Sequence, residues 1–488
     1  MARPYGGFLR SHRYPGCRVV THLLLRLNLC AAVLAFAVAA CSEDGAEPAK
    51  PAPRGPTSTV SEAPPEPPQA AVRVVDGDTL KPLRRAVLAV GGERIAVEGD
   101  SGAILVPRKS ASLRVSAPGY ATRVVPVNFR GGLMQRIELW SPRLQWPMYG
   151  VNAARTQAHS GIKLRPPFRV VWKRNLGGLL EFPAMVWNGV AYVNNIYGRL
   201  RALSVRTGQV LWRQRVGRKM ASSPGIDPRR GILVTTSMSP GDVKVISMET
   251  GRVKWRFHTG LTEPSPLIRN GVAYFGATNG NVYALDLDRR RPRWVFRGGA
   301  KITGSPALVG KRLFVGDYAG RVFALDARNG RVIWRASAGS RVYGTVAVAG
   351  GRVFAPSVFS GLSAFSARSG RLLWRIPVGA YLYSSPAVYR SRVYFGAYTG
   401  LVYCASATSG RILWARPAGG NVSGAIEVVA GLVYAASFGN RITAWDWRTG
   451  RTVWSFPHGR YVPVSGNANH LLLHGAREIW AVKPKRKK

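Results

Sequence analysis

The chain of 488 residues has few cysteines, few acidic residues and few histidines. Its four cysteines are too few for a disulfide framework in a chain of this length. Neither an HExxH nor a GxSxG motif occurs, so the seven histidines give no signature of a zinc protease or a serine hydrolase. Glycine (55) and proline (33) are plentiful, which favours many turns and short strands over a helical bundle.

The shortage of acidic residues leaves a strongly basic chain. Lys and Arg number 70 against 23 Asp and Glu, which gives a net charge of +47. A codon bias toward arginine would account for this excess. Adhesion to lipid headgroups, envelope polymers or nucleic acid is the functional alternative, and the two are compatible because the positive field exists whatever produced it.

The N-terminus has the pattern of an export signal. Five arginines precede an apolar run over 27–40, which is short for a membrane span of about 20 residues. The run ends in Val38-Ala39-Ala40-Cys41, which resembles a bacterial lipobox and implies diacylation of Cys41. An uncleaved anchor that begins near Val19 and a plain cleaved signal are the alternatives, and all three place the rest outside the cytoplasm.

A proline-rich segment over 42–70 follows, with eight prolines and almost no large apolar side chains. Such a segment cannot bury enough surface to offset its ordering entropy, so a disordered tether is predicted. Residues 71–140 then contain six short apolar stretches separated by turn residues, which predict a small β-domain.

This β-domain resembles the carboxypeptidase regulatory-like family, a seven-stranded prealbumin-like sandwich. The matching residues are Asp76, Pro82, Leu83, Ala86, Asp100, Gly102, Gly119 and Tyr120. Leu80 departs from the family pattern, where a glycine is usual. The resemblance implies a non-catalytic spacer or adhesive module.

The remaining chain, 141–488, is one repeat used eight times. Each copy contains a tryptophan preceded by a glycine turn: Trp172, Trp212, Trp255, Trp294, Trp334, Trp374, Trp414 and Trp454. The near-constant spacing and the four short apolar stretches in each copy predict an all-β, eight-bladed propeller of four-stranded blades. The tryptophans are predicted to pack between blades rather than to bind a ligand.

The repeat also predicts how the ring closes. The first tryptophan strand, 168–176, has no inner strands before it, and the last copy has inner strands but no tryptophan strand after it. The two fragments complement each other, so one blade is predicted to combine both ends of the propeller.

These repeats resemble the PQQ-type (pyrroloquinoline-quinone) propeller repeat, and 145–156 resembles the segment that leads into such propellers. The family includes quinoprotein dehydrogenases and the lipoprotein scaffold of outer-membrane-protein assembly. The dehydrogenases imply a bound Ca²⁺, an Asp base and a disulfide between adjacent cysteines. The chain has no adjacent cysteine pair, and Glu181, Glu263 and Asp317 are scattered, so we predict no catalytic residue, no cofactor and no metal site.

One mouth of the channel is the candidate binding site. Cations, aromatic groups and an amide recur before the inner strands, and four aromatic residues recur in the second loops. The candidates are Lys219, Lys301, Arg341, Tyr381, Asn421 and Tyr461, together with Tyr318, Phe359, Tyr398 and Phe438. This combination suits an anionic or sugar-like ligand or a peptide strand, whereas packing between blades is the alternative role of the aromatic rings.

The sequence as a whole predicts a monomeric, membrane-anchored, extracytoplasmic scaffold without catalysis. Its predicted partners are envelope proteins, or anionic polymers and lipid surfaces, and not nucleic acid, because export removes the opportunity. A quinoprotein dehydrogenase and a binder of anionic polymer or carbohydrate are the alternatives.

Overall fold

The computed structural model describes residues 69–90, 93–97, 103–107, 112–126 and 134–485. Cys41, the predicted export signal and nearly all of the predicted tether lie outside these residues. Within the described ranges, no helix has both the length and the apolar character needed to cross a bilayer.

Two small sheets precede the repeats. The first has the strand order β4-β1-β7 and the second β3-β2-β5-β6. Their bounds are β1 (Gln69–Asp76), β2 (Val87–Val90), β3 (Glu93–Ala96), β4 (Ala103–Pro107), β5 (Ser112–Ser116), β6 (Arg123–Pro126) and β7 (Gln135–Leu139). Buried aliphatic side chains from both sheets, among them Val74, Leu88 and Leu113, share one core. The sequence did not single out β3, which is short and carries two charged residues.

Two residues of the sandwich resemblance meet in the structure. The Tyr120 hydroxyl donates a hydrogen bond of 2.6 Å to the Asp76 carboxylate. The other Asp76 oxygen accepts from the backbone N–H groups of Asp78 and Thr79, which closes the turn after β1. Seven strands in two sheets agree with the predicted sandwich, while the family assignment itself stays a prediction.

Eight four-stranded antiparallel blades follow, so the predicted eight-bladed propeller is confirmed. Blades 1 to 4 comprise β10 (Met185–Trp187), β11 (Val190–Asn194), β12 (Arg199–Ser204) and β13 (Val210–Arg215); β14 (Gly225–Asp227), β15 (Ile232–Thr236), β16 (Asp242–Ser247) and β17 (Val253–His258); β18 (Leu267–Arg269), β19 (Val272–Gly276), β20 (Asn281–Asp286) and β21 (Arg291–Arg297); β22 (Ala307–Val309), β23 (Arg312–Gly316), β24 (Arg321–Asp326) and β25 (Val332–Ser337).

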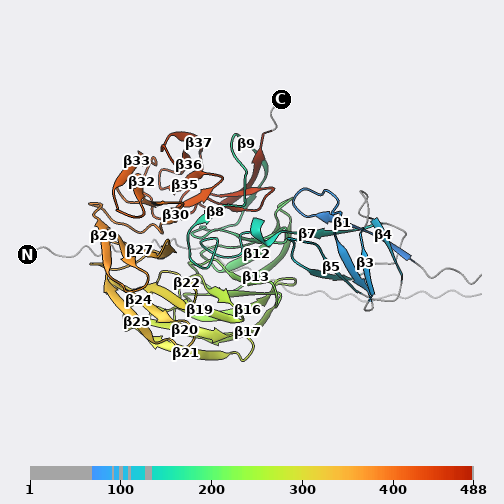
Figure 1. Cartoon of the computed structure of the whole chain (residues 1–488), viewed down its shortest axis with the longest axis horizontal. Helices are drawn as coiled ribbons and strands as arrows, with labels where there is room; N and C mark the ends of the chain where they lie inside the picture. The colour runs from blue at the N-terminus through green and yellow to red at the C-terminus, as the bar shows by residue number, and fades with distance from the viewer. Residues whose placement is uncertain (1–68, 91–92, 98–102, 108–111, 127–133, 486–488) are drawn as a thin grey trace, which may run out of the picture. The chain divides into compact units, whose positions relative to one another are not determined.

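Blades 5 to 8 complete the ring (Figure 1). They comprise β26 (Ala347–Ala349), β27 (Arg352–Ser357), β28 (Gly361–Ser366) and β29 (Leu372–Ile376); β30 (Ala387–Tyr389), β31 (Arg392–Gly396), β32 (Leu401–Ser406) and β33 (Ile412–Pro417); β34 (Glu427–Val429), β35 (Leu432–Ser437), β36 (Arg441–Asp446) and β37 (Thr452–Phe456); β38 (Val464–Gly466), β39 (Leu471–His474), β40 (Glu478–Pro484) and β9 (Phe168–Asn175).

Blade 8 joins the two ends of the propeller. β9 pairs with β40 in antiparallel register from Asn175 opposite Glu478 to Phe168 opposite Pro484. In Figure 1 the teal β9 lies beside the red C-terminal strand. The predicted closure is therefore confirmed.

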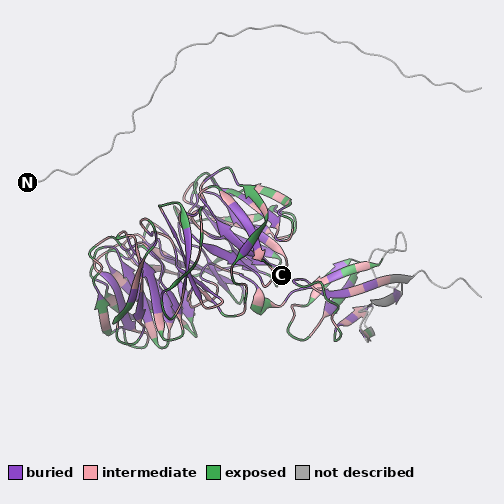
Figure 2. Cartoon of the chain, turned by 90° about the horizontal axis from the view of Figure 1, so that it is seen from above, coloured by how far each residue is buried: buried purple, intermediate pink, exposed green. Residues whose placement is uncertain are grey.

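Burial follows the position of each strand in its blade. The inner strands are almost wholly buried, whereas outer strands such as β13 alternate between exposed and half-buried residues (Figure 2). Every blade also has a register shift beside its tryptophan, for example between Ala202 and Leu203 opposite β13. Such bulges increase the twist of the outer strand.

Candidate functional site

The tryptophans of the repeat join each blade to the next. The Trp334 indole Nε1 donates to the carbonyl of Ala367 in blade 5, at 3.2 Å. The indole also covers Gly370, where a Cβ would lie 2.7 Å from the ring. Five tryptophans donate in this way, namely Trp172, Trp212, Trp294, Trp334 and Trp374. Trp414 lies against Gly450 without a partner for its N–H, and Trp454 packs edge-on against Phe168.

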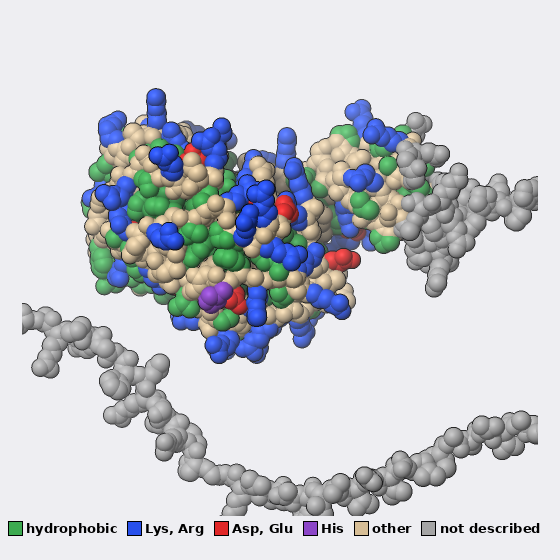
Figure 3. All heavy atoms as spheres, turned by 90° about the horizontal axis from the view of Figure 1, so that it is seen from below, with side chains coloured by type: hydrophobic (Ala, Val, Ile, Leu, Met, Phe, Trp, Pro, Cys, Tyr) green, Lys and Arg blue, Asp and Glu red, His purple; other side chains and the backbone are tan. Residues whose placement is uncertain are grey.

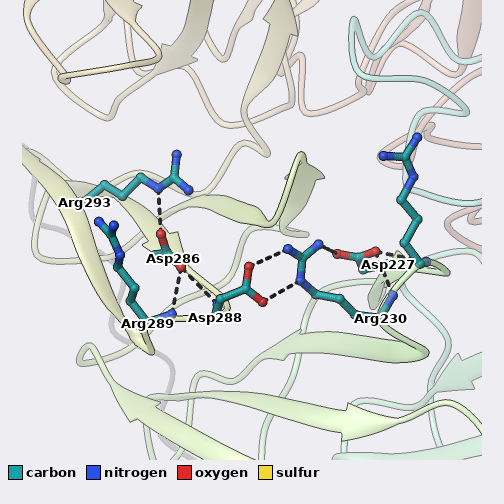
Figure 4. Close-up of polar contacts among 7 residues, drawn as sticks. Asp227, Arg230, Asp286, Asp288, Arg289 and Arg293 are labelled. Atoms are coloured by element: carbon teal, nitrogen blue, oxygen red, sulfur yellow. Dashed lines mark hydrogen bonds and ion pairs between the residues drawn. The ribbon is translucent and has the colours of Figure 1, made fainter.

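Trp255, between blades 2 and 3, makes neither the indole hydrogen bond nor the glycine contact among the described residues. The hairpin of blade 3 has Arg290 with a φ of 57° at the position where Trp334 faces a glycine. An ion-pair network joins the two blades instead (Figure 4). The Arg230 guanidinium contacts Asp227 of its own blade at 3.0 Å and Asp288 of blade 3 at 2.5 Å.

Hydroxyl groups link the innermost strands around the channel. The backbone N–H of Ser265 donates to Ser305 Oγ, and the N–H of Ser305 donates to Thr345 Oγ1, each at 2.9 Å. In the same way, the N–H of Ser223 donates to Ser265 Oγ, and the N–H of Thr345 donates to Ser385 Oγ. The repeated Ser-Pro of the sequence is thus a structural motif that satisfies buried backbone donors.

The segment over 145–167, which lies between the short 3₁₀ helix η1 (Pro142–Leu144) and β9 and which we call the plug, closes one end of the channel. The carbonyls of Ala153, Ala154, Thr156 and Gln157 accept hydrogen bonds from the innermost strands of blades 4, 5, 6 and 7, in that order. The next residues form β8 (Ala158–His159), which pairs in parallel with β34.

Arg155 is the fully buried centre of the plug. Its guanidinium donates to the carbonyls of Tyr149, Pro306 and Ser265, which belong to the plug and to blades 4 and 3. Burial lowers the pKa of Arg155 to about 9. Nearby, burial raises the pKa of Tyr149 to about 12, and the Tyr149 hydroxyl donates to Ser385.

The predicted mouth lies at the opposite end of the channel. The loops that lead into the inner strands pair there, through their backbones, with the loops between the second and third strands. Within each blade, the carbonyl in the leading loop accepts from the N–H in the second loop: Lys301 from Tyr318, Arg341 from Val358, Tyr381 from Tyr398 and Asn421 from Phe438. This backbone pairing places cations beside aromatic rings. The Lys301 ammonium lies 5.2 Å from the Tyr318 ring centroid, and the Arg341 guanidinium lies 5.2 Å from that of Phe359.

The aromatic residues of blades 4 to 8 form a continuous arc, which we call the aromatic arc. It runs through Tyr318, Tyr343, Tyr383, Tyr398, Phe438 and Tyr461, with Tyr381 and Phe359 beside it. Neighbouring ring centroids are 5.0–6.1 Å apart. Phe359, Tyr381 and Tyr343 remain 59%, 45% and 39% exposed, so the rings pack on one another and still present a surface.

Below the arc lies a cavity of about 90 Å³ to which all eight blades contribute. Tyr343, Tyr383 and Tyr461 line it together with Glu181 and Glu263. Glu263 accepts a 2.6 Å ion pair from Lys301, which removes that cation from the free charges of the mouth. Burial, followed by the charge of Glu263, raises the pKa of Glu181, against the opposing effect of Lys219.

The structure therefore brings only some of the predicted mouth residues together. Lys219 lies at the exposed rim, and among the described residues neither Lys219 nor Asn421 contacts a ring of the aromatic arc. Sequence reasoning missed Tyr343 and Tyr383, which directly precede the Gly-Thr and the Ser-Ser that lead into the inner strands of blades 5 and 6. It also missed Arg460, whose guanidinium lies 5.1 Å from the Phe438 ring.

Two further features of the described residues concern the remaining cysteine and metal binding. Cys404 is fully buried in β32. The described residues contain no group of three or more His, Cys, Asp or Glu side chains arranged to hold a metal ion.

The sequence of the propeller matches a known family. The family model described as outer membrane protein assembly factor BamB matches residues 169–295, 278–379 and 358–480. BamB of Burkholderia pseudomallei (strain K96243) is 26% identical over 133 residues, which cover 27% of this chain and 34% of that protein. A quinoprotein ethanol dehydrogenase of Pseudomonas putida is 33% identical over 93 residues, 18% of this chain and 15% of that enzyme. The chain thus spans about a third or less of the length of these relatives.

Solved structures share the fold at low identity. BamB from Moraxella catarrhalis superposes with a TM-score of 0.54 at 16% identity, covering 65% of this chain and 99% of that one. A europium-containing methanol dehydrogenase superposes with a TM-score of 0.60 at 12% identity, covering 70% and 98%. Since the family matches extend over more than half of its residues, the chain belongs to the PQQ-like propeller family described as outer membrane protein assembly factor BamB.

Proposed function

We propose that the chain is a non-catalytic scaffold of the cell envelope that binds a segment of a partner protein at the mouth of its propeller. The aromatic arc carries this proposal. Exposed aromatic side chains supply large contact area, and aromatic residues dominate the binding energy at protein interfaces. Membership of the BamB family supports a role in the envelope.

The arrangement favours a partner segment with apolar and acidic side chains. Apolar side chains would cover Phe359, Tyr381 and Tyr343, which are the most exposed rings of the arc. Acidic side chains would meet Arg341 and Lys219, which lie exposed at the rim. A rim of charge around an apolar centre is the usual anatomy of a protein interface.

The residues of the channel do not fit the quinone cofactor of the dehydrogenase relatives. Pyrroloquinoline quinone carries three carboxylates, whereas the cavity is lined by two glutamates and by no Lys or Arg among the described residues. Its volume of about 90 Å³ is also well below the roughly 300–1,000 Å³ of typical ligand pockets. These features support the non-catalytic proposal, and purified protein supplied with the quinone and Ca²⁺ is expected to show no dye-linked alcohol oxidation.

A photo-crosslinking amino acid placed at Phe359 tests the binding proposal in living cells. We expect one discrete adduct, and we expect its yield to fall at least fivefold when Tyr381→Ala and Tyr398→Ala are added. The matched control is the same amino acid at Leu372, an exposed residue of the outer strand β29. Absence of an adduct at Phe359, or the same adduct from both positions, would contradict the proposal.

We further propose that Cys41 anchors the chain to the membrane and that the two N-terminal sheets act as a spacer. The lipobox-like sequence before Cys41 supports the anchor. Labelled palmitate is expected to mark the wild-type protein and to leave Cys41→Ala unlabelled. Equal labelling of both proteins, or of neither, would exclude lipidation at Cys41.

A further inference from the structure

A second candidate site lies at the end of the propeller opposite the mouth. The hairpins that join first to second strands, and third to fourth strands, lie at that end because neighbouring strands are antiparallel. One such hairpin of blade 6, both of blade 7 and the residues at and just after the end of β8 enclose a groove of about 400 Å³. An adjoining groove of about 460 Å³ shares Arg390 and Trp447 with it. We call the two together the Trp447 groove.

The lining of the Trp447 groove contains five basic residues. Lys163 and Arg165 come from the segment after β8, and Arg390, Arg392 and Arg411 come from blade 6. None of the described residues that line either groove is acidic. The neighbouring carboxylate of Asp446 accepts hydrogen bonds from its own hairpin, at the N–H groups of Arg448 and Thr449.

Lysine and arginine are spread widely over this protein, so charge alone does not identify a site. Figure 3 shows them scattered over the visible face, with few acidic side chains between them. The Trp447 groove differs because its cations come from separate segments and converge on one cavity. Arg390 distinguishes it further, because a long cationic side chain stands at a left-handed hairpin position and contacts aromatic rings.

Arg390 adopts a left-handed backbone conformation with a φ of 55°. The corresponding hairpin residues in other blades are Asn188, Asn270, Gly310, Gly350 and Ala430, also with positive φ. Asparagine and glycine tolerate this conformation, whereas a long side chain is unusual there. Such strained residues cluster at functional sites.

Aromatic rings hold the Arg390 side chain at the groove. Its guanidinium carbon lies 4.9 Å from the Trp447 ring centroid and 5.5 Å from that of Tyr389. No described residue accepts a hydrogen bond from this guanidinium or pairs with its charge. Arg392, in contrast, donates to the carbonyl of Arg448 at 2.6 Å and therefore supports the hairpin. Arg390 thus presents free N–H donors at its edge.

We propose that the Trp447 groove binds a phosphorylated saccharide through its phosphate monoester group. The guanidinium fork matches two phosphate oxygens, and stacking on an indole fixes its plane. Lys163 and Arg165 supply further positive charge for a doubly charged group. The hydroxyls of Ser160 and Ser391, and a volume larger than phosphate needs, suit the sugar that carries it.

Calorimetric titration of the full chain in detergent tests this proposal, with glucose 6-phosphate as the probe. We expect saturable binding at one site, and at least tenfold weaker binding of glucose and of inorganic phosphate. Arg390→Gly is expected to weaken glucose 6-phosphate binding at least tenfold. This variant should fold, because glycine occupies the same hairpin position in blades 4 and 5.

Arg290→Gly is the matched control. It removes the same charge from another left-handed hairpin position, with a φ of 57°, in blade 3. Its affinity for glucose 6-phosphate is expected to stay within twofold of the wild type. Equal weakening by the two variants, absence of binding, or glucose or phosphate binding as tight as glucose 6-phosphate would overturn the proposal.

Discussion

At the scale of single residues, the contact between tryptophan and glycine explains why the repeat is so regular. The hairpin glycine needs a positive φ, and the indole of the preceding blade occupies the space that a side chain would take. Both demands fall on one position, so the tryptophan and the glycine recur together. Where blade 3 has Arg290 instead, Arg230 and Asp288 supply a different connection between blades.

Gly370→Ala is expected to destabilise the propeller. The added Cβ would lie 2.7 Å from Trp334, in a backbone conformation with a φ of 75° that L residues rarely adopt. Overpacking of this kind costs about 1–3 kcal/mol. Denaturant unfolding measures the change in the free energy of unfolding, and a change below 0.5 kcal/mol would contradict the packing argument. Arg290→Gly, its counterpart in blade 3, is expected to change stability by less than about 1 kcal/mol.

The burial of Glu427 leads to a prediction about how stability depends on pH. Its carboxyl is fully buried at the start of β34, and neither oxygen has a hydrogen-bond partner among the described residues. Burial raises its pKa well above the usual value in the folded state, so the folded protein prefers the protonated form. Stability from this group is therefore fully present below the unfolded pKa of about 4.3 and is lost as the pH rises toward the folded pKa.

Glu427→Gln should therefore stabilise the protein relative to the wild type by an amount that grows as the pH rises above about 4.3. Unfolding free energies measured between pH 4 and pH 8 give the difference directly. Glu249→Gln, at an exposed residue, is the control and should show no such trend. A constant difference across this range would mean that Glu427 is not kept protonated by burial.

At the scale of elements, the plug between η1 and β9 ties the blades together from inside the channel. Its backbone contacts the inner strands of five blades, and Arg155 adds two more connections through its side chain. An arginine with neutral carbonyl partners is tolerated here because three carbonyls replace the water it loses. The plug is therefore part of the core of the propeller.

Arg155→Leu is expected to lower the free energy of unfolding by about 3–5 kcal/mol, because three buried carbonyls would lose their donor. Arg143→Leu, at an exposed residue of η1, serves as the control and should change it by less than about 0.5 kcal/mol. Thermal unfolding of both variants checks the expectation. Equal melting temperatures would show that the plug is peripheral to stability.

The sequence predicts the elements and the closure of the ring well, and it predicts the side-chain contacts between different repeats poorly. The spacing of Trp172 through Trp454 predicts eight blades and the closure of blade 8, because each repeat is a local unit with its own signature. The ion pair of Lys301 with Glu263 and the aromatic contacts of Tyr343 and Tyr383 join residues of different repeats. Which side chains meet there depends on the geometry of the ring, which spacing along the chain does not contain.

At the scale of the whole molecule, blade 8 decides whether the propeller is a closed ring. Deleting 463–488 would remove three of its strands and expose the faces of blades 1 and 7 to water. Each large buried side chain contributes about 1.5–3 kcal/mol, against a total stability of about 5–15 kcal/mol. The truncated protein is therefore expected to lose its cooperative thermal transition.

An open array of repeats would respond differently, since losing a terminal unit costs a single interface. Thermal unfolding of the truncated protein beside the full chain distinguishes the two. A truncated protein that melts within a few degrees of the intact one would contradict a closed ring.

The pairing of β9 with β40 also sets the order in which the propeller can be completed. During synthesis β9 emerges from the ribosome before any complete blade, and its partner strand β40 emerges only after the seven other blades have been synthesised. Until then β9 offers an unpaired edge, which is a template for wrong pairing. If export delivers the chain unfolded, as the N-terminus predicts, the final step takes place outside the cytoplasm. We therefore expect newly exported chains to depend most on holding chaperones before residue 484 has been translocated.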